Sequence, residues 1–380
     1  MEWKEDILGN VLEVKYGKDH KKLSEGNIPV YGSGGLMRYV DTKLYDGPSI
    51  LIPRKGTLNN IMFVKTPFWT VDTMFWSIIN VEKVDPQFLF YSICKKDFAS
   101  MNVGSAVPSM TVNILNDIQI SYPKDLADQR RIASILSSLD RKIELNNKIN
   151  ADLEEMAQAI FKNWFVDFEP FKDGKFVDSE LGMIPEGWKV GCLGDMGNIV
   201  CGKTPSKSNS NYYGGDIPFI KIPDMHGNVF VENSEDRLTE EGSLSQIKKL
   251  IPPYSLMVSC IATVGLVSIN TKSSHTNQQI NTVIPHNKSA LFYLYQHMKN
   301  NEEFLKNMGR GGTTTLNVNT RSFSNIRLLI PSEIALEQFH RVVEGLFKKI
   351  ELNLHESRTL SLLRDTLLPR LMSGELEVPE

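Results

Sequence analysis

The sequence repeats itself at one long interval, and this repeat constrains the fold more than any other feature. The pentapeptide Lys-Ile-Glu-Leu-Asn at 142–146 recurs at 349–353, an offset of 207 residues. The offset is 206 to 208 from residue 49 onwards, and it falls to 189 and 185 towards the start of each half. A single long interval indicates a duplicated protein rather than a solenoid. We therefore expect two related halves of about 190 residues, each variable in length early and fixed in length late.

The late part of each half predicts one long helix. Apolar residues recur there at alternating spacings of four and three, which is the 3.5-residue period of a coiled-coil seam. We expect helices over 126–168 and 333–372, with Pro369 ending or kinking the second. At about 1.5 Å per residue, each helix would be roughly 50–60 Å long. Each stretch follows a proline and a candidate N-cap residue, namely Pro123 with Asp125 and Pro331 with Ser332.

A single stripe of this kind is most often the core face of an ordinary domain helix. Two matching stripes, each about twice the usual helix length, favour helices that pack on each other. Both stripes are polar at the same depth, and buried polar seam residues fix the register of a helix pair. An antiparallel pair would bring these polar layers together around a pseudo-two-fold axis. The expected seam residues are Ile132, Leu136, Leu139, Ile143, Asn146, Asn150, Leu153, Ile160, Trp164, Phe339, Val343, Leu346, Ile350, Asn353, Leu360 and Leu367.

The early part of each half predicts a mixed α/β domain. Turns rich in Gly, Pro, Asn and Ser separate short β-like runs at 49–52, 61–64, 256–258 and 326–330, and two stretches, 86–97 and 290–308, look helical. The chain is then an α/β protein with two such domains and a coiled-coil spacer. The expected order is a target domain at 1–125, a long helix at 126–168, a linker at 169–187, a second target domain at 188–332, a second long helix at 333–372 and a tail at 373–380.

Charge differs between these parts, although the net charge of the whole chain is only −3. The domain segments 1–127 and 186–335 have net charges of 0 and +2, while 128–185 and 336–380 have −3 and −2. A negative total therefore does not argue against nucleic acid, whose footprint is a local basic surface. No apolar run reaches the roughly 18 residues of a membrane span. The N-terminus resembles no secretory signal, so we expect a cytoplasmic protein with no membrane partner.

Several short motifs resemble catalytic sites without the context that such sites need. Residues 197–204 match the phosphate-binding pattern GxxxxGK[ST], but a P-loop opens a helix at its Lys-Thr, and here a turn-rich stretch beginning with Pro205 follows. Pro252-Pro253-Tyr254 is similar to a signature of DNA amino-methyltransferases, but Ile251 before it offers no polar side chain. Gly32 to Gly35 is better explained as a turn than as a nucleotide loop. The four cysteines and seven histidines show no metal-ligand spacing, so we expect no catalytic residue and no metal site.

Four stretches closely resemble the specificity (S) subunits of type I restriction–modification systems. Residues 158–171 (QAIFKNWFVDFEPF) resemble the family's central region, and 182–188 (GMIPEGW) resemble the entry to its second target-recognition domain. Residues 367–375 (LLPRLMSGE) resemble its C-terminal region. Residues 197–205 resemble its recurrent Gly-Lys-Thr-Pro loop, which accounts for the P-loop match. The resemblance covers essentially the whole chain.

The resemblance implies a non-catalytic reader of double-stranded DNA. Each target-recognition domain would read one half of a bipartite, asymmetric site. The paired helices would set the spacing and dock two methyltransferase (modification) subunits, and motor-nuclease (restriction) subunits would join through that complex. S-adenosylmethionine, ATP and magnesium would be bound by those partners, and this chain would carry no cofactor. The helix length is of the right order, because two-fold DNA readers place their modules about 34–36 Å apart, or a multiple of that.

Candidate DNA contacts are basic and aromatic side chains in expected loops, because Arg and Lys contact phosphates or guanine edges. Three adjacent amides at 277–279 could read adenine. The candidates are Lys15, Lys18, Lys21, Lys22, Arg38, Arg54, Lys55, Lys203, Lys207, Tyr212, Tyr213, Lys221, Asn277, Gln278, Gln279, Arg310 and Arg321.

Two other functions remain open from the sequence. One is a stand-alone nucleotide- or S-adenosylmethionine-dependent DNA enzyme built on Gly202-Lys203-Thr204 or Pro252-Pro253-Tyr254. The other is a coiled-coil scaffold without a DNA role. Tight binding of labelled ATP or S-adenosylmethionine to the purified chain would support the enzyme, and a lack of salt-dependent DNA binding by the assembled complex would support the scaffold.

Overall fold

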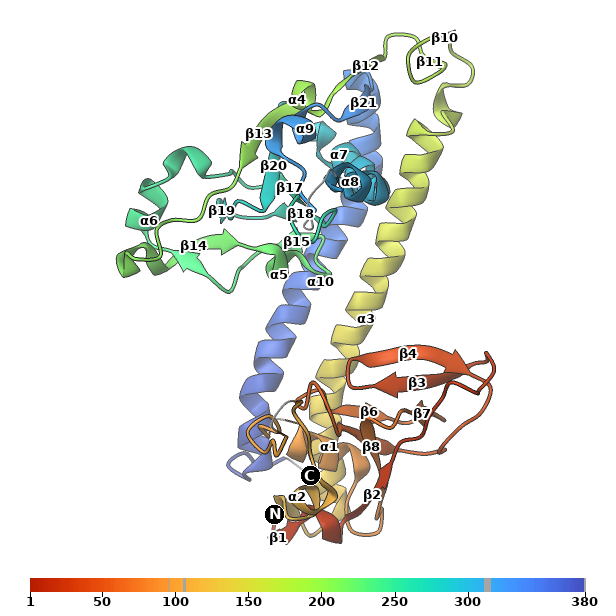
Figure 1. The fold of residues 1–380 in the computed structure, drawn as a ribbon, viewed down its shortest axis with the longest axis vertical. Coiled ribbons are helices and arrows are strands. Elements are labelled where there is room, and N and C mark those ends of the chain that lie inside the picture. The colour runs from red at the N-terminus through yellow and green to blue at the C-terminus, as the bar shows by residue number, and fades with distance from the viewer. Residues whose placement is uncertain (95, 105–106, 311–315, 379–380) are drawn as a thin grey trace. The chain divides into compact units, whose positions relative to one another are not determined.

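The computed structural model describes residues 1–94, 96–104, 107–310 and 316–378. The chain forms two compact units (Figure 1). The first unit comprises Met1–Glu144 and Ser357–Glu380, and the second comprises Leu145–Glu356. Each unit therefore combines one α/β domain with part of both long helices. Within the described ranges, no helix is both long enough and apolar enough to cross a membrane.

Two helices of 40 residues, α3 (Leu126–Phe165) and α10 (Glu333–Met372), confirm the long helices predicted from the heptad spacing (Figure 1). Their N-termini are capped as expected. The Asp125 carboxylate accepts a hydrogen bond from the Ala127 N–H at 2.8 Å, and Ser332 Oγ accepts one from the Ala335 N–H at 3.3 Å. Each cap satisfies a backbone donor that has no partner within the first helical turn.

α3 ends earlier than expected, whereas α10 ends at the expected residue and Pro369 does not end it. α3 ends at Phe165 and does not reach residue 168, because Phe168 adopts a left-handed φ of 55°, which an α-helix cannot contain. α10 continues through Pro369 to Met372. The proline removes only one helical hydrogen bond so close to the end, and the Ser373 N–H bonds to the Pro369 carbonyl at 3.0 Å.

The domain of the first unit consists of three small sheets. In strand order these are β1-β9, β2-β8-β5-β6 and β4-β3-β7, with β3 and β7 parallel and the other pairs antiparallel. The strands are β1 (Trp3–Ile7), β2 (Leu12–Tyr16), β3 (Ile28–Gly32), β4 (Gly35–Val40), β5 (Ser49–Pro53), β6 (Met62–Val64), β7 (Trp69–Thr70), β8 (Met74–Ile79) and β9 (Gln119–Pro123). The short helices are η1 (Leu8–Asn10), α1 (Pro86–Ile93) and α2 (Val112–Asn116).

The domain of the second unit repeats this topology. Its sheets are β12-β21, β13-β20-β17-β18-β15 and β16-β14-β19, with β14 and β19 parallel in the place of β3 and β7. The strands are β12 (Lys189–Cys192), β13 (Gly197–Cys201), β14 (Tyr213–Ile220), β15 (Phe230–Val231), β16 (Arg237–Leu238), β17 (Leu256–Ser259), β18 (Val267–Asn270), β19 (His275–Thr276), β20 (Ile280–Pro285) and β21 (Arg327–Ile330). The helices are α4 (Leu193–Met196), η3 (Ser210–Tyr212), α5 (Ile222–Met225), α6 (Glu240–Leu244), η4 (Ile247–Lys249), η5 (Lys288–Ala290), α7 (Leu291–Asn300), α8 (Glu302–Gly309) and α9 (Thr320–Ser324).

The sequence anticipated much of this pattern. All four β-like runs coincide with strands, namely β5, β6, β17 and β21, and the two helix-like stretches contain α1 and the pair α7 and α8. The segment expected to be a linker holds a single 3₁₀ turn, η2 (Glu169–Phe171), and a small hairpin of β10 (Phe176–Val177) and β11 (Ile184–Pro185). The described part of the expected tail, 373–378, packs on the first unit, where Leu376 and Val378 lie against its core.

All of the expected seam residues are buried or partly buried. The buried stripe is wider than a two-stranded seam, because each helix also packs on its own domain. In the second unit Phe165 packs edge-on against Phe339 and Tyr293, with ring centroids 4.9 and 4.7 Å away. Phe347 stacks on Phe292 at 4.1 Å. In the first unit the buried side chains of Ile132, Leu136, Leu368 and Leu371 join the domain core.

A polar layer interrupts the apolar packing of the helices in the second unit. Asn146 Nδ2 donates to Glu356 Oε2 at 2.8 Å, and Asn353 Nδ2 donates to Asn150 Oδ1 at 2.8 Å. As residue numbers rise along α3, those of their partners fall along α10, so the helices are antiparallel. Because a buried amide is costly when its partner is lost, these hydrogen bonds favour one register of the pair.

Candidate nucleic-acid interface

In the second unit, segments far apart in sequence meet around one β-turn. The turn spans 277–280 and is closed by a hydrogen bond from the Ile280 N–H to the Asn277 carbonyl at 3.2 Å. The Asn277 N–H donates to the Ile220 carbonyl at 3.2 Å, which attaches the turn to β14. The Lys203 N–H donates to the Thr276 carbonyl at 2.9 Å, and the Gly202 N–H donates to the Ile280 carbonyl at 3.1 Å.

The loop after β17 completes the arrangement. The Cys260 N–H donates to the Gln279 carbonyl at 2.7 Å, and the Ala262 N–H donates to the Leu316 carbonyl at 3.0 Å. Ala262 has a left-handed φ of 64°. We call the segments 202–207, 220–223, 260–263 and 276–280 the cradle of the second unit. Its turn is held by backbone hydrogen bonds from several directions, so its central side chains are presented from a fixed base.

The first unit contains the same arrangement. The turn 71–74 is closed by the Met74 N–H and the Val71 carbonyl at 2.9 Å, and the Val71 N–H donates to the Tyr31 carbonyl at 3.1 Å. The Lys18 N–H donates to the Thr70 carbonyl at 2.9 Å, and the Arg54 N–H donates to the Thr73 carbonyl at 2.8 Å. The cradle of the first unit comprises 17–22, 31–34, 54–57 and 70–74. Corresponding residues are offset by 185, 189 and 206, so the duplication seen in the sequence extends into this region.

A glycine stands in each cradle because two backbone segments approach closely. A Cβ on Gly202 would lie 2.1 Å from the Asn277 carbonyl oxygen and 2.3 Å from Thr276 Oγ1. A Cβ on Gly17 would lie 2.0 Å from the Val71 carbonyl oxygen. Interiors packed at this density leave no room for a methyl group. The glycine of the Gly-Lys-Thr sequence therefore serves the packing of one loop on another.

The same geometry is incompatible with a phosphate-binding P-loop. The N–H groups of Gly202 and Lys203 are bonded to protein carbonyls, and Thr204 Oγ1 donates to Gln278 Oε1 at 2.6 Å. Residues 202–206 are not helical, so no helix N-terminus faces a phosphate. The first unit carries Gly17-Lys18 in the equivalent place, but Asp19 follows, so the phosphate-binding pattern does not match there.

Most candidate contacts of the first unit lie on or beside its cradle. Lys18, Lys21, Lys22 and Lys55 are exposed there. Arg54 Nη1 donates to the Asp72 carbonyl at 3.2 Å, and its guanidinium lies 5.3 Å from the centre of the Tyr16 ring. Lys15 lies on the adjoining strand β2, in an ion pair with Glu13. These side chains place positive charge around the turn.

Two candidates are occupied by the protein itself. Arg38 Nη2 donates to the Leu23 carbonyl at 2.6 Å and to the His20 carbonyl at 3.2 Å. Lys221 forms an ion pair with Asp236. Both side chains hold loops beside the cradles. Their contact with DNA stays a prediction, and these intramolecular bonds argue against it because they already use the charged groups.

Most candidates of the second unit lie on or beside its cradle. Asn277 Nδ2 donates to Gln279 Oε1 at 2.9 Å, and Asn277 Oδ1 accepts from the Gln279 N–H at 3.1 Å. The Tyr213 hydroxyl donates to the Pro205 carbonyl at 2.8 Å, and burial raises the pKa of Tyr213. Lys203 and Lys207 are exposed on the same loop, and Tyr212 is partly exposed beside it. Arg310, at the end of α8, and Arg321, on α9, are exposed outside the four segments.

A buried histidine supports the turn of the second unit. His275, on β19, is fully buried, with Nε2 2.8 Å from Ser243 Oγ and Nδ1 3.4 Å from Gln246 Nε2. Burial lowers the pKa of His275 to about 4, so the imidazole is neutral near pH 7. Nothing in the sequence indicated this role, because a lone histidine is most often an ordinary surface or core residue.

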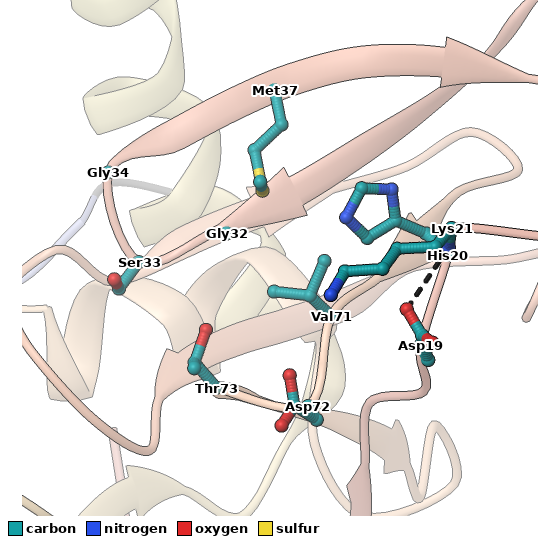
Figure 2. A pocket seen from close by; sticks show the side chains of 10 residues that line it. All are labelled: Asp19, His20, Lys21, Gly32, Ser33, Gly34, Met37, Val71, Asp72 and Thr73. Carbon is teal, nitrogen blue, oxygen red and sulfur yellow. Dashed lines mark hydrogen bonds between the residues drawn. The ribbon is translucent and has the colours of Figure 1, made fainter.

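A pocket of about 670 Å³ lies beside the turn of the first unit (Figure 2). Gly32 and Gly35 pair across a tight hairpin at its edge, as the glycine-rich sequence predicted, and Gly35 has a φ of 111°. Met37 lines the pocket, and with Leu36 it is about half exposed. Exposed apolar side chains can contact the methyl group of thymine. Sequence reasoning missed them, since nothing in an apolar strand residue indicates that it will face solvent.

The chemistry of the two cradles is that of recognition. Among the residues described by the structure, no three His, Cys, Asp or Glu side chains are grouped so that they could hold a metal ion. Cys260, whose backbone N–H bonds to the second turn, is a free thiol, and burial raises its pKa to about 11. The exposed lysines of both cradles and the exposed amide of Gln278 are suited to phosphate and base-edge contacts, whereas the Asn277 amide is buried and bonded to Gln279.

Two copies of one α/β domain, each with a basic and polar cradle, and a pair of long antiparallel helices define a two-module nucleic-acid-recognition protein. The family model of the type I restriction modification DNA specificity domain matches residues 1–155 and 185–360, one match in each half of the repeat. The chain belongs to this family and is a specificity subunit of type I restriction–modification systems, which is a recognition component and not an enzyme. The resemblance seen in the sequence is thereby confirmed.

Relatives of similar length support this assignment. The type I restriction enzyme HindI specificity subunit of Haemophilus influenzae is 37% identical over 374 residues, with 81% of each chain covered. The type I restriction enzyme MjaIX specificity subunit of Methanocaldococcus jannaschii is 29% identical over 353 residues, with 89% of this chain and 80% of that one covered. A solved S subunit from M. genitalium superposes with a TM-score of 0.64 over 98% of this chain and 96% of that one. At 14% identity, this last likeness shows the fold alone.

Proposed function

We propose that this chain reads a bipartite, asymmetric site in double-stranded DNA, with one half-site for each cradle. The observation that carries the proposal is the duplication of the cradle. The same backbone hydrogen bonds hold a β-turn in both units, while the turns themselves carry different side chains, Val71-Asp72-Thr73 and Asn277-Gln278-Gln279. The residues exposed at the centre of the two turns, Asp72 and Gln278, differ, and a repeated scaffold with different exposed residues is what two unlike half-sites require. The lysines and arginines around each turn would contact phosphates and supply affinity that depends on salt.

The proposed domain limits follow from the order of elements. Residues 1–125 and 188–332 would be the target-recognition domains, and α3 and α10 would form the spacer between them. Helices of 40 residues are about 60 Å long, and the hydrogen-bonded asparagine layer would hold them in one register. The distance between the half-sites would then follow from helix length.

The long helices would also dock two methyltransferase subunits. Both carry large apolar side chains that are about half exposed or more, which is a common property of interaction surfaces. Motor-nuclease subunits would join through the methyltransferases, and the partners would carry S-adenosylmethionine, ATP and magnesium in the cytoplasm. The exposed apolar residues are Leu145 and Met156 on α3 and Ile334, Val342, Leu352, Leu362 and Leu363 on α10.

Methylome sequencing tests the reading role. The chain is expressed with its methyltransferase partners in a host that lacks other modification systems. We expect adenine methylation at a single bipartite motif, and no methylation when the chain or its partners are expressed alone. Methylation without a bipartite motif would contradict the proposal, and so would tight binding of S-adenosylmethionine to the purified chain.

A second experiment tests the spacer. Seven residues are removed from α3 and from α10 at equal distances from the asparagine layer, so that the helices stay paired. We expect a shorter spacer between two unaltered half-sites in the methylome. An altered half-site with an unchanged spacer would refute the role of the helices as a ruler.

A further inference from the structure

The duplication of the cradle points to a base-contacting residue in the first unit, Asp72, which is not among the DNA-contact candidates predicted from the sequence. We propose that Asp72 and Gln278 occupy equivalent base-reading positions, and that they select different bases. The Asp72 carboxylate would accept a hydrogen bond from the N4 amino group of cytosine, and the Gln278 amide would pair with adenine. This inference rests on the proposed function, which it extends to named residues and bases.

The backbone makes the two positions equivalent. Val71 and Asn277 each donate an N–H to the end of the parallel neighbour strand, and each carbonyl closes the turn with the residue three positions on. Asp72 and Gln278 are therefore both the first central residue of their turn. The next residues, Thr73 and Gln279, accept through their carbonyls from the Arg54 and Cys260 N–H groups, at 2.8 and 2.7 Å. No shift in register is possible without breaking these bonds.

The Asp72 side chain is available to a ligand. It is exposed, and within the described part of the chain its carboxylate has no hydrogen-bond or ion-pair partner. It lines the pocket together with Thr73 and Lys21, which reaches over the turn from the opposite loop (Figure 2). Arg54 stabilises the turn, because its guanidinium donates a hydrogen bond to the Asp72 backbone carbonyl at 3.2 Å.

Electrostatics determine what this carboxylate can read. It lines the pocket with Lys21 and a second carboxylate, Asp19, and Arg54 bonds to its backbone carbonyl; the exposed lysines of the cradle suit a phosphate backbone. A carboxylate there repels phosphates and also the O6 and N7 acceptors of guanine and the O4 acceptor of thymine. An amino group that donates a hydrogen bond stabilises the carboxylate, and cytosine N4 is the donor that Asp and Glu most often contact in the major groove. The residue would therefore discriminate largely by repulsion of the wrong base.

The Gln278 side chain is oriented for a different base. Its Oε1 accepts from Thr204 Oγ1 at 2.6 Å, which restricts the amide to one orientation before DNA arrives. A carbonyl oxygen has a second lone pair, so Oε1 can still accept from adenine N6 while Nε2 donates to adenine N7. This bidentate pairing is the usual way in which Gln and Asn read adenine.

Reciprocal substitutions test the inference in the assembled methyltransferase complex. In Asp72→Asn, one cytosine position of one half-site should change its preference to adenine, and the other half-site and the spacer should stay the same. In Gln278→Glu, one adenine position of the other half-site should change to cytosine. A bidentate contact discriminates by about 5- to 150-fold, and competitive methylation of a library randomised at each position would measure that change.

The controls separate this inference from the proposed function. Asp117→Asn makes the same charge change at an exposed position of the first unit outside the cradle, and it should leave the motif unaltered. Asp72→Ala should relax the same base pair to all four bases, which keeps the test available if Asp72→Asn fails to assemble. A wild-type complex without a bipartite motif would refute the proposed function. A bipartite motif that Asp72→Asn, Asp72→Ala and Gln278→Glu all leave unaltered would overturn this inference alone.

Discussion

Replacing Gly202 by alanine should damage one unit of the protein selectively. The new Cβ would lie 2.1 Å from the Asn277 carbonyl oxygen, whereas real Cβ contacts essentially never fall below 3.0 Å. Overpacking of this kind costs about 1–3 kcal/mol. Moving the loop away would also break the 2.9 Å hydrogen bond from the Lys203 N–H to the Thr276 carbonyl, which contributes about 0.5–1.5 kcal/mol. We expect a total loss of about 2–4 kcal/mol from the second unit.

Scanning calorimetry of the full chain measures this loss. For a unit of this size, it should lower the unfolding temperature by about 5–15 °C. Methylome sequencing should show that the half-site of the second unit is weakened while the other half-site is retained. Gly345→Ala is the matched control, because its Cβ meets no atom within 4 Å in α10 and should stabilise the helix by about 0.5–1 kcal/mol. A Gly202→Ala chain that unfolds at the wild-type temperature would refute the packing role of this glycine.

Three further predictions follow from polar groups that are buried or partly buried. Arg364 Nη1 lies 2.7 Å from Asp140 Oδ1, and the Asp140 carboxylate also accepts a hydrogen bond from the Tyr91 hydroxyl. Arg364→Met should lower the free energy of unfolding in urea by about 1–2 kcal/mol. Adding Asp140→Asn should recover part of this loss, whereas losses that simply add would argue against coupling of the two residues. The pKa of His275 is lowered to about 4 in the folded chain, so as the pH falls the unfolded chain protonates this histidine before the folded chain does. The free energy of unfolding should therefore be highest above about pH 6.5 and fall by about 1–2 kcal/mol by pH 5. A His275→Gln chain with the same pH dependence would exclude this histidine as the cause. Asn353→Leu should lower the free energy of unfolding by about 1–3 kcal/mol, because it leaves the Asn150 amide oxygen without its donor. A triple Asn146→Leu, Asn150→Leu, Asn353→Leu chain, which replaces all three amides, should be more stable than the single variant in the same urea assay.

The long helices were predictable because their determinants are local and repeated. The 3.5-residue spacing specifies a helix and the side that it buries, and a cap such as Asp125 needs only the next few residues to act. The wider burial, which includes Phe161 and Phe347, was not predicted because it depends on packing against the domain as well as on the partner helix. Likewise, Phe168 ended α3 early through its own left-handed backbone, a conformation that a phenylalanine rarely adopts.

The cradles could not be predicted from residue types. They are assembled from backbone hydrogen bonds between segments such as Lys203 and Thr276, and a backbone N–H is the same for almost every residue. Their traces in the sequence are the repeat offsets and a glycine at each close approach, Gly17 and Gly202. The amides at 277–279 were named because their side chains suggest chemistry, whereas the equivalent Asp72 was not, since an acidic residue argues against DNA contact until its surroundings are known.

The division of the chain between the two units has a consequence for synthesis on the ribosome. The second unit is one continuous stretch, Leu145–Glu356, whereas the first needs Ser357–Glu380 to join residues made some 200 positions earlier. At about 5–20 residues per second, the first domain would wait roughly 10–40 s for that segment. During this interval the apolar surfaces of Ile132 and Leu136 would lack Leu368 and Leu371, with which they share a core. The amino-terminal domain would thus be the last to mature and the one most dependent on chaperones.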